Sequence, residues 1–470
     1  MSAHPLEELL RPRSIAVVGA SKSGRGGGFV APLLELGFKG DIYPVNPKYT
    51  EIMGMKAYPR VRDIPGPVDY VISSIPAAGV LGLLDDCAEK GVKLVHLFTA
   101  RFSETGRKDA AQLEQDILRK AREAGIRLIG PNCMGIYYPA MGISFNSGMP
   151  SESGSVGVVS QSGQAVGEMV GGAAARGIRF SKAISYGNAL DFNECDYLEY
   201  FAQDPETKMV LLYIEGVRDG PRFLKALREL AAVKPVIAVK GGRGESGTRA
   251  TASHTASLAG SREIWQTVVN QTGVVTARDL EELVDIAVAF YFLPPFKGRR
   301  VGVTGGSGGS SVLAADLCEE AGLDVIPLPD DIREELRRRG NPVWDWIGNP
   351  ADFSISMGDH NDTAAITRLM AQHPDFDMMI LFVSGPWHRG RRFSIDEHMA
   401  QYGFEHMNSK PVVLVFGDRP RGTGREAARY EKINDELKSR LIEAHYPMFP
   451  GIRRAASAVG KMISYYEKKR

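Results

Sequence analysis

Several features that would assign this chain to a common class of protein are missing or scarce. Its 470 residues include only four cysteines, Cys87, Cys133, Cys195 and Cys318, and no two of them form a CxxC pair. This scatter favours free thiols in a reducing cytoplasm over disulfides or a zinc site. No apolar run is long enough to cross a bilayer, and the amino terminus lacks the basic-then-apolar order of a signal peptide. We therefore expect a cytoplasmic protein with no part in a membrane.

An excess of either charge is also missing. The formal net charge is +1, from 57 Lys and Arg against 56 Asp and Glu. A nucleic-acid-binding domain normally has a clear basic excess, so we expect no nucleic-acid partner. The histidines after residue 300 show no metal-ligand spacing, and we expect no metal site in this chain. A hydrophobic fraction of 43% and a charged fraction of 24% are typical of a globular protein, and the length allows three domains.

The first 130 residues begin with an apolar strand that runs into a Gly/Ser turn at Gly19 and Ser21, and a helix follows from Phe29. Such a turn forms a phosphate site, because free backbone N–H groups and the helix dipole point at the ligand. The glycine spacing is not a clean GxGxxG. Lys48 stands where an NAD enzyme would place a ribose-binding carboxylate, which favours a phosphorylated ligand. A solvated loop lysine is the alternative for Lys48.

More apolar strands follow at βαβ spacing, at Tyr70–Ile75, Leu94–Thr99 and Ile126–Ile129. Strands that alternate with helices predict a parallel sheet covered on both faces. The loops after these strands, which include Pro76 and Asn132, are expected at the carboxyl edge of the sheet, where ligands gather.

A second strand-turn-helix element has Ser160, Gln161, Ser162 and Gly163 at its turn. The N–H groups and hydroxyls of this turn would face an anion at the start of the following helix. A capped helix start without a ligand is the alternative.

The segment from Thr251 to Gly260 places His254 among small and hydroxyl residues. Imidazole can carry a phosphoryl group covalently and give it up again, and small neighbours let a phosphate come close. The alternative is a helix start capped by Ser253, with His254 merely near it.

The segment Met209–Val217 predicts an apolar strand that ends in one carboxylate, Glu215, and the next strand, Pro235–Lys240, precedes the His254 segment. We therefore expect Glu215 and His254 at the same edge of one sheet. A carboxylate bonded to one imidazole nitrogen fixes the tautomer and leaves the other nitrogen nucleophilic. A loop ion pair of Glu215 with Lys240 or Arg243 is the alternative.

After a linker at Leu293–Arg300, the strand-glycine-helix pattern returns, as if one domain type had been used twice. Its turn contains Gly305, Gly306, Gly308 and Gly309. Met378–Val383 and Pro411–Phe416 are buried-type strands. The end, Ile452–Tyr466, has helical spacing and a basic finish, which predicts a solvated terminal helix.

Taken together, these motifs resemble those of the alpha subunit of NDP-forming acyl-CoA synthetases, the family of the ADP-forming acetate–CoA ligases, which are relatives of succinyl-CoA synthetase. The resemblance covers nearly the whole chain. The motifs that carry it are Tyr43–Lys48, Gly130–Ile136, Ser160–Gly163, Tyr213–Val217, Ser253–Gly260 and Asn349–Asp352.

The resemblance implies an α/β fold with an N-terminal Rossmann-like CoA-binding domain (1–130) and two flavodoxin-like, succinyl-CoA synthetase-type domains (131–293 and 298–470). It implies that His254 is transiently phosphorylated and that Glu215 steadies it. The residues implied near CoA are Gly19, Ser21, Lys48, Pro76 and Asn132. Those implied to hold phosphate are Ser160, Gln161, Ser162, Gly163, Gly305, Gly306, Gly308 and Gly309.

The implied reaction is reversible: acyl-CoA, ADP and phosphate give the free acid, CoA and ATP, through an acyl phosphate and phospho-His254. In the family an ATP-grasp domain binds the nucleotide with Mg²⁺, and this chain shows no such domain. We therefore expect a separate ATP-grasp beta subunit, in an α2β2 assembly.

This chain departs from the family pattern at three places. Arg101 replaces a glycine, the first loop reads Gly24–Gly28 without the usual lysine, and aromatics are unusually frequent around Trp344 and Trp387. Arg101 could narrow the acyl site or pair with an extra carboxylate. These departures favour an acid larger than acetate, either aromatic or dicarboxylic.

Other functions stay open at this point. One is a nucleotide-independent CoA-binding protein, such as a CoA sensor or a derivative of a CoA-transferase or hydrolase. An NAD-dependent oxidoreductase is disfavoured by the weak glycine pattern and the missing ribose carboxylate. The presence of both Glu215 and His254 favours the ligase. The acyl group, ADP against GDP, the direction in the cell and the oligomeric state are left open.

Overall fold

The structure, a computed structural model, describes residues 4–21, 28–247, 262–342, 344–352, 360–383, 410–416 and 425–469. The chain divides into two compact units, Met1–Leu283 and Val284–Arg470, and each is treated by itself. No helix within these described ranges is long and apolar enough to cross a membrane.

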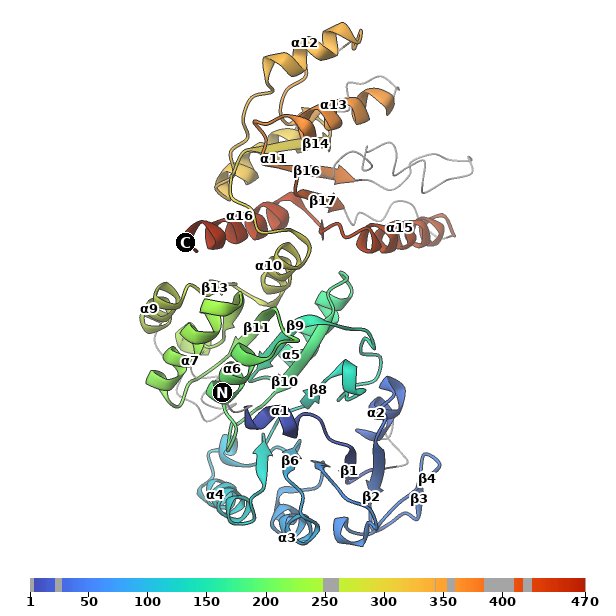
Figure 1. Cartoon of the computed structure of the whole chain (residues 1–470), viewed down its shortest axis with the longest axis vertical. Helices are drawn as coiled ribbons and strands as arrows, with labels where there is room; N and C mark the ends of the chain where they lie inside the picture. Colours follow the sequence, from blue (N-terminus) through green and yellow to red (C-terminus); the bar gives the residue numbers. More distant parts are fainter. Residues whose placement is uncertain are drawn as a thin grey trace. The chain divides into compact units, whose positions relative to one another are not determined.

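The first unit starts with a five-stranded parallel sheet of order β2-β1-β5-β6-β7 (Figure 1). Its strands are β1 (Ser14–Val18), β2 (Asp41–Val45), β5 (Tyr70–Ser73), β6 (Leu94–Leu97) and β7 (Arg127–Ile129). The accompanying elements are α1 (Pro5–Leu9), α2 (Val30–Leu36), the hairpin β3 (Glu51–Ile52) and β4 (Met55–Lys56), α3 (Val80–Lys90) and α4 (Lys108–Glu123). Every residue of β1, β5 and β6 is buried. A strand buried on both faces needs a continuous apolar run, which is the pattern in the sequence.

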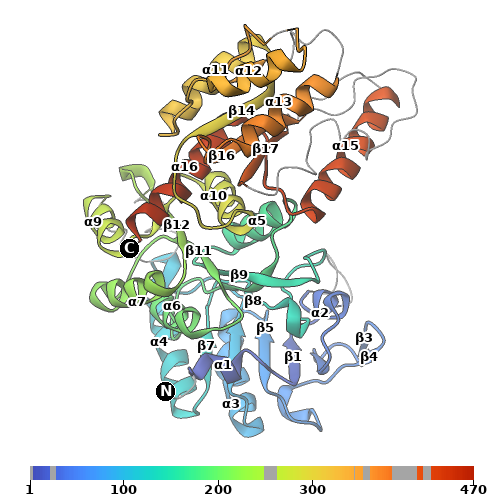
Figure 2. The same ribbon diagram turned by 45° about the horizontal axis from the view of Figure 1, so that its top comes forward.

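The second sheet of this unit has the order β13-β12-β11-β9-β10-β8, and only its edge strand β8 runs antiparallel. Its strands are β8 (Gly135–Tyr137), β9 (Ser153–Ser160), β10 (Phe180–Ser185), β11 (Met209–Ile214), β12 (Val236–Lys240) and β13 (Val275–Thr276). Its helices are α5 (Gly163–Ala174), α6 (Glu194–Gln203), α7 (Gly220–Val233) and α9 (Arg262–Thr272), and the division between the two units falls within α10 (Leu280–Phe292). Figure 2 shows α5 on one face of this sheet and α6 and α7 on the other.

The second unit contains a third sheet, entirely parallel, of order β15-β14-β16-β17-β18. Its strands are β14 (Val301–Gly306), β15 (Ala351–Asp352), β16 (Met378–Val383), β17 (Val412–Phe416) and β18 (Met448–Phe449). Its helices are α11 (Gly308–Glu320), α12 (Asp330–Arg338), α13 (His360–Gln372), α15 (Arg425–Glu443) and α16 (Ile452–Lys468). The α/β class expected from the sequence is confirmed.

The three sheets share one strand order. When the parallel strands of each sheet are numbered along the chain, the order is 2-1-3-4-5 in all three. In this order the loops after the first and third strands diverge, and a crevice opens between them at the carboxyl edge. Gly19, Ser160 and Gly305 lie at the end of the first strand of their respective sheets. Each predicted anion site therefore lies at the switch point of its own sheet.

The last helix is not the solvated helix that we expected. α16 buries one whole face, which includes Ala455, Val459 and Ile463. Its Arg454 makes a two-pronged ion pair with Asp285 at 2.6 and 2.8 Å. The basic residues at the end of the helix suggested that it is solvated. The apolar stripe along its other face instead packs against the rest of the unit.

A buried ion-pair cluster holds the first unit together near β10. Lys182 is fully buried, and its Nζ lies 2.9 Å from Asp204 Oδ2 and 2.7 Å from Glu206 Oε2. Burial alone would raise the pKa of Glu206, but hydrogen bonds from Lys182, Arg11 and Tyr138 outweigh it and lower the pKa to about 2. Because Arg11 follows α1, the cluster fastens the start of the chain to the second sheet.

We predict that Lys182→Met lowers the free energy of unfolding by about 3–5 kcal/mol, because it leaves the fully buried Asp204 without its cation. Urea unfolding of the purified chain measures this change. Arg119→Ala, which removes an exposed pair with Asp116, is the control and should leave the midpoint where it is. Equal unfolding midpoints for Lys182→Met and the parent chain would contradict the stabilising role of the Lys182 ion pairs.

Candidate active site

Glu215 comes directly after β11, beside the turn that follows β9. The two strands are parallel neighbours, with Tyr213 opposite Ser160, and the N–H of Gln161 donates to the Tyr213 carbonyl at 3.1 Å. Glu215 is 6% exposed. The carboxylate and the Ser160–Gly163 turn, predicted separately from the sequence, therefore share one edge at the switch point of the second sheet.

The side chain of Gln161 connects these two loops. Its Oε1 accepts the backbone N–H groups of Glu215 at 2.8 Å and of Gly216 at 3.0 Å. Because an oxygen must occupy this position, the amide orientation is set, and Nε2 is left as the remaining donor. The sequence predicts Gln161 as a phosphate ligand, and the structure shows that its carbonyl holds the Glu215 loop.

The Glu215 carboxylate receives a hydrogen bond from Tyr213, whose Oη lies 3.2 Å from Oε1. Burial, with the nearby charge of Glu215, raises the pKa of Tyr213 to about 12, so the phenol stays protonated. Lys240 donates to the backbone carbonyls of Glu215 and Gly241, and burial lowers its pKa. Arg243 donates to the Arg278 carbonyl. Both cations that the sequence offered as ion-pair partners thus bond to carbonyl oxygens.

The start of α5 is arranged to meet an anion. Ser162 is its N-cap and accepts the Ala165 N–H at 3.3 Å, while Ser160 Oγ donates to the Ser162 carbonyl at 2.7 Å. The N–H groups of Gly163 and Gln164 have no acceptor among the described residues, and the first turn contains no acidic residue. An anion placed here would meet two backbone donors and the positive end of the helix dipole.

In the first sheet, Gly19 ends β1 in the left-handed region, with φ +89°. A Cβ at this position would lie 2.7 Å from Ser74 Oγ, so the turn needs glycine for both conformation and space. Ser21 follows in the same loop, and Gly24–Gly27 of the glycine-rich stretch lie outside the described residues.

Lys48 and Pro76 lie at the same carboxyl edge, after β2 and β5. Asn46 Nδ2 donates to the Ala20 carbonyl at 2.7 Å and fixes the Lys48 loop against the Gly19 loop. Lys48 itself is exposed. The structure therefore brings Gly19, Lys48 and Pro76 to one edge, as the sequence predicts.

Asn132 joins the edges of the first and second sheets. It has φ +60°, and its N–H donates to the Thr99 carbonyl at 3.1 Å. Its Nδ2 donates to Asn188 Oδ1 at 3.3 Å, and Asn188 lies in the loop after β10. Within the first unit, the two predicted binding edges are thus in direct contact.

Arg101 occupies a left-handed position, φ +83°, which is unusual for a residue other than glycine. Glu104 holds it there by accepting the N–H groups of Arg101 and Phe102. Glu104 also accepts a 2.7 Å hydrogen bond from Asn188 Nδ2. Through Glu104, the backbone of Arg101 is therefore linked to Asn188, while Arg101 itself is exposed.

The second unit repeats the strand-turn-helix element at β14 and α11. Gly305 has φ +89°, and a Cβ there would collide with the Phe382 carbonyl on the neighbouring strand β16. Ser310 Oγ accepts the Ser307 N–H at 2.9 Å and donates to the Ser307 carbonyl at 2.7 Å, which closes the first turn of α11. Gly308 and Gly309 open this helix and Gly306 ends the strand, so all four glycines surround one helix start.

Some predicted residues lie outside the described part of the chain. His254 and its neighbours fall between residues 248 and 261, and Trp387 falls between 384 and 409. The strand that precedes His254, β12, does pair with β11, as expected from the sequence. Trp344 is 37% and Trp346 61% exposed in the second unit.

The sequence-based reasoning did not single out Tyr213 or Asn188. Tyr213 is two residues before Glu215, and side chains two apart on an extended chain share a face. That spacing was the available signal for Tyr213. Asn188 had no local signal, because its contacts with Glu104 and Asn132 cross between two sheets.

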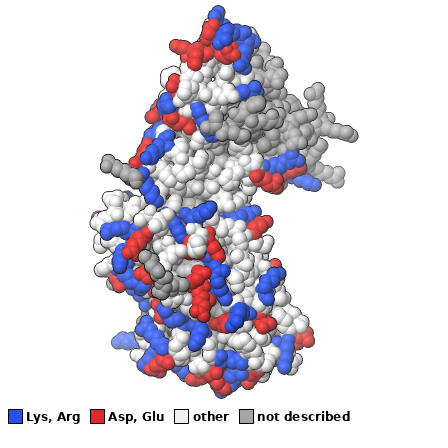
Figure 3. Space-filling model, in the orientation of Figure 1, with Lys and Arg blue, Asp and Glu red and all other residues white. Residues whose placement is uncertain are grey.

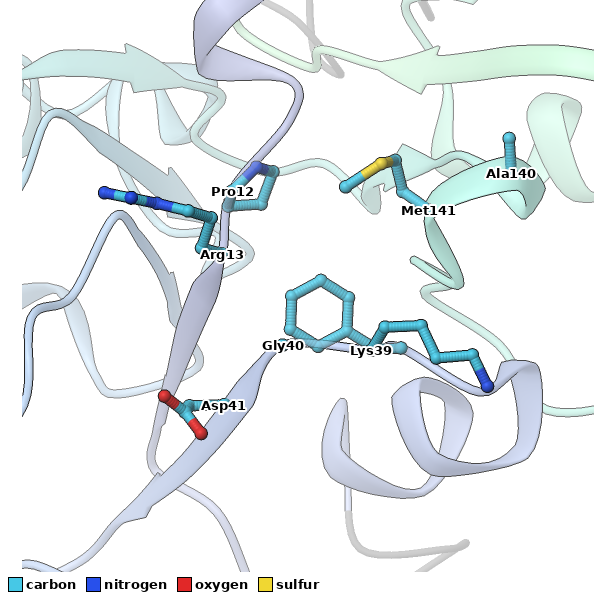
Figure 4. Close-up of a pocket in the computed structure, with 8 residues that line it drawn as sticks. Pro12, Arg13, Lys39, Gly40, Asp41, Ala140 and Met141 are labelled. Carbon is cyan, nitrogen blue, oxygen red and sulfur yellow. The ribbon is translucent and has the colours of Figure 1, made fainter.

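One surface hollow of about 400 Å³ lies away from these residues, at the amino ends of β1 and β2 (Figure 4). Pro12 and Met141 border it, and the charged ends of Arg13 and Lys39 point away from it. It is therefore poorly suited to an anion. Over the face seen in Figure 3, acidic and basic side chains are interspersed wherever they are described. The described residues contain no group of three or more His, Cys, Asp or Glu that could hold a metal ion.

Comparisons with known families match three parts of the chain. Residues 13–139 match the CoA binding domain, residues 153–290 the succinyl-CoA ligase like flavodoxin domain, and residues 301–392 the ligase-CoA domain. Each matched range contains one of the three sheets or most of it.

The chain is 38% identical over 415 residues to the alpha subunit of acetate–CoA ligase [ADP-forming] II of Pyrococcus furiosus. The aligned residues make up 87% of this chain and 90% of that subunit. It is 33% identical to trans-feruloyl-CoA synthase FCS1 from an unknown prokaryotic organism, over 98% of this chain and 65% of that enzyme. The chain spans about half the length of two other archaeal acetate–CoA ligases that it matches.

Among solved structures, the chain is similar to a dinucleotide-forming acetyl-coenzyme A synthetase 1 of Ca. Korarchaeum cryptofilum in complex with phosphate and ADP. The TM-score is 0.80 at 31% identity, with 99% of this chain and 97% of that chain covered.

We predict that Gly19→Ala weakens CoA binding at least tenfold, because the new Cβ meets Ser74 Oγ and a left-handed alanine costs about 1–2 kcal/mol. Isothermal titration with CoA measures the affinity. Gly37→Ala is the matched control, since Gly37 has φ +79° but its Cβ would meet only the flexible end of Lys39 at 3.9 Å. Equal CoA affinity in Gly19→Ala and the control would remove Gly19 from the site.

Proposed function

This chain belongs to the family of ADP-forming acyl-CoA ligases as an alpha-subunit-type member, and we propose that it carries a phosphoryl group on His254 between an acyl phosphate and ADP. The net reaction interconverts acyl-CoA, ADP and phosphate with the free acid, CoA and ATP. The observation that carries this proposal is the position of Glu215, buried at the switch point of the second sheet and beside the start of α5.

Each loop at the carboxyl edges of the sheets has a role in the proposed reaction. The first sheet's loops at Gly19, Ser21, Lys48, Pro76 and Asn132 hold CoA, next to the phosphate at Ser160–Gly163. Phosphate oxygen attacks the thioester carbonyl, and the C–S bond breaks, so that CoA leaves as the thiol once its sulfur takes up a proton. An imidazole nitrogen of His254 then attacks phosphorus, the bond from phosphorus to the acyl oxygen breaks, and the acid leaves as carboxylate.

Glu215 and the helix starts provide the electrostatics of this route. An ionised Glu215 stabilises the positive charge on the phosphorylated imidazole. Backbone N–H groups at the start of α5 stabilise the phosphoryl oxygens without reorganising. We propose that Gly305, Gly306, Gly308 and Gly309 at α11 form a second phosphate cradle for the travelling group. We also propose that the chain has three functional domains, each built around one sheet: residues 1–130, 131–293 and 298–470.

We further propose that an ATP-grasp beta subunit binds ADP and Mg²⁺, in an α2β2 assembly. The support is that two relatives from Pyrococcus furiosus, which match 87% and 79% of this chain, are named as alpha subunits. The ATP-forming half of the reaction would then need the partner, whereas phosphorylation of His254 from acyl-CoA and phosphate would not.

The first prediction from this function is covalent labelling. Incubation of the chain with acyl-CoA and radiolabelled phosphate should give an acid-labile, alkali-stable label that is absent from His254→Ala. Glu215→Gln should form it about 10²–10⁴-fold more slowly, because the imidazole loses its charged partner. Gel autoradiography at alkaline pH measures the label. No label with any acyl-CoA, even with an ATP-grasp partner added, would favour a nucleotide-independent CoA-binding role.

The acyl group is proposed to be larger than acetate, either aromatic or dicarboxylic. Arg101 supports this, because it is exposed and its backbone is linked through Glu104 to Asn188, which contacts Asn132. A guanidinium at this place would pair with an extra carboxylate on the acid. One relative, which matches 98% of this chain, is named a feruloyl-CoA synthase, while relatives at 38% identity are named acetate–CoA ligases.

We predict that kcat/KM is higher for succinyl-CoA or an aryl-acyl-CoA than for acetyl-CoA. Arg101→Gly should reduce that preference about tenfold or more, since a hydrogen bond to a charged group is lost. Glycine suits φ +83°, so the variant keeps the loop conformation. A labelling assay with the three thioesters compares them, and a preference for acetyl-CoA in the parent chain would refute the larger acid.

A further inference from the structure

We propose that Tyr213 is a positioning residue for Glu215, and that its hydroxyl fixes the orientation of the Glu215 carboxylate for His254. The inference rests on the proposed function, because Tyr213 has this task only if Glu215 steadies phospho-His254.

The geometry around Glu215 restrains both its backbone and its side chain. Gln161 Oε1 accepts the N–H groups of Glu215 and Gly216 at 2.8 and 3.0 Å, and Lys240 donates to the Glu215 carbonyl. With its backbone fixed, the side chain turns only about its own bonds. Tyr213 Oη, 3.2 Å from Oε1, fixes one carboxylate oxygen.

Gly241 gives an independent reason to regard this pair as built into the fold. A Cβ on residue 241 would lie 2.9 Å from Tyr213 Oη and 3.2 Å from Glu215 Cγ. Gly241 does not have a positive φ, so its backbone conformation does not require glycine. The space that its missing side chain leaves is the space that the Tyr213–Glu215 pair occupies.

The groups that face Glu215 come from three strands. Tyr213 is on β11, Lys240 ends β12, and Tyr186 follows β10 and is buried near Glu215. Lys240 already bonds to two carbonyl oxygens, and burial raises the pKa of Tyr186 well above its usual value. Tyr213, whose pKa is raised to about 12, remains a donor over the whole working range.

The consequence for the reaction is a change in rate and not in substrate binding. When His254 takes the phosphoryl group, its ring becomes cationic, and a carboxylate held in a fixed position stabilises that charge. Without the Tyr213 hydroxyl, the Glu215 side chain loses the contact that fixes it, so phosphoryl transfer to His254 should slow. Acyl-CoA is proposed to bind at the first sheet, so its KM should stay the same.

The test is the initial rate of His254 labelling by acyl-CoA and radiolabelled phosphate, measured on the full chain over a range of acyl-CoA concentrations. Tyr213→Phe should lower the maximal rate about tenfold, which corresponds to the loss of one hydrogen bond to a charged group, and should leave the KM for acyl-CoA unchanged. Gly241→Ala, which crowds the same pair, should lower the maximal rate in the same way.

Tyr200→Phe is the matched control. Its hydroxyl donates to Glu7 at 3.1 Å, so the variant also loses a phenol–carboxylate hydrogen bond in the same unit, but away from Glu215. Its maximal rate and KM should equal those of the parent chain. Circular dichroism of each variant confirms that the fold is kept.

The outcomes separate the two proposals. If the parent chain is labelled at His254 but Tyr213→Phe keeps the maximal rate, or changes the KM for acyl-CoA as much as the rate, Tyr213 does not position Glu215 and the inference is wrong. If the parent chain is not labelled at His254 with or without an ATP-grasp partner, the proposed function fails first and the role of Tyr213 fails with it.

Discussion

The parallel pairing of β9 with β11 is the contact on which the site depends. It places Tyr213 opposite Ser160, and the Gln161 side chain then closes the gap between the diverging loops through Glu215 and Gly216. An anion site at the start of α5 and a buried carboxylate after β11 become neighbours for this reason alone. If another strand lay between β9 and β11, the loops that follow them would be too far apart to contact the same phosphoryl group.

The same arrangement recurs in each of the three sheets, and the proposed function uses each of them for a phosphorylated group. Strand order 2-1-3-4-5 opens a crevice beside the first strand, and Gly19, Ser160 and Gly305 each lie at such a crevice. The first two are joined within one unit by Asn132 and Asn188. A thioester bound at the first sheet would therefore lie close to a phosphate bound at the second sheet.

Much of this could be predicted from the sequence, because buried parallel strands are continuous apolar runs and the residues that follow them share an edge. Glu215 and the glycine turns were found in this way. The use of Gln161 Oε1 on the Glu215 loop could not be predicted, since it depends on which strands are neighbours. The burial of α16 was not predicted, because the element that covers its apolar face is known only from the packing of the second unit. Arg101 was noticed as a departure, but its left-handed backbone follows from Glu104 and Asn188, which are distant in sequence from each other.

The central claim is that Glu215 serves a phosphorylated His254, and the most direct measurement is the site of phosphorylation itself. Peptide mapping by tandem mass spectrometry under alkaline conditions, after incubation of the chain with acyl-CoA and phosphate, locates the group without assuming a residue. The account predicts a phosphoryl group on His254 in the peptide that spans residues 251–260. A phosphoryl group found only on another residue would contradict it, and the geometry around Glu215 would then need another purpose.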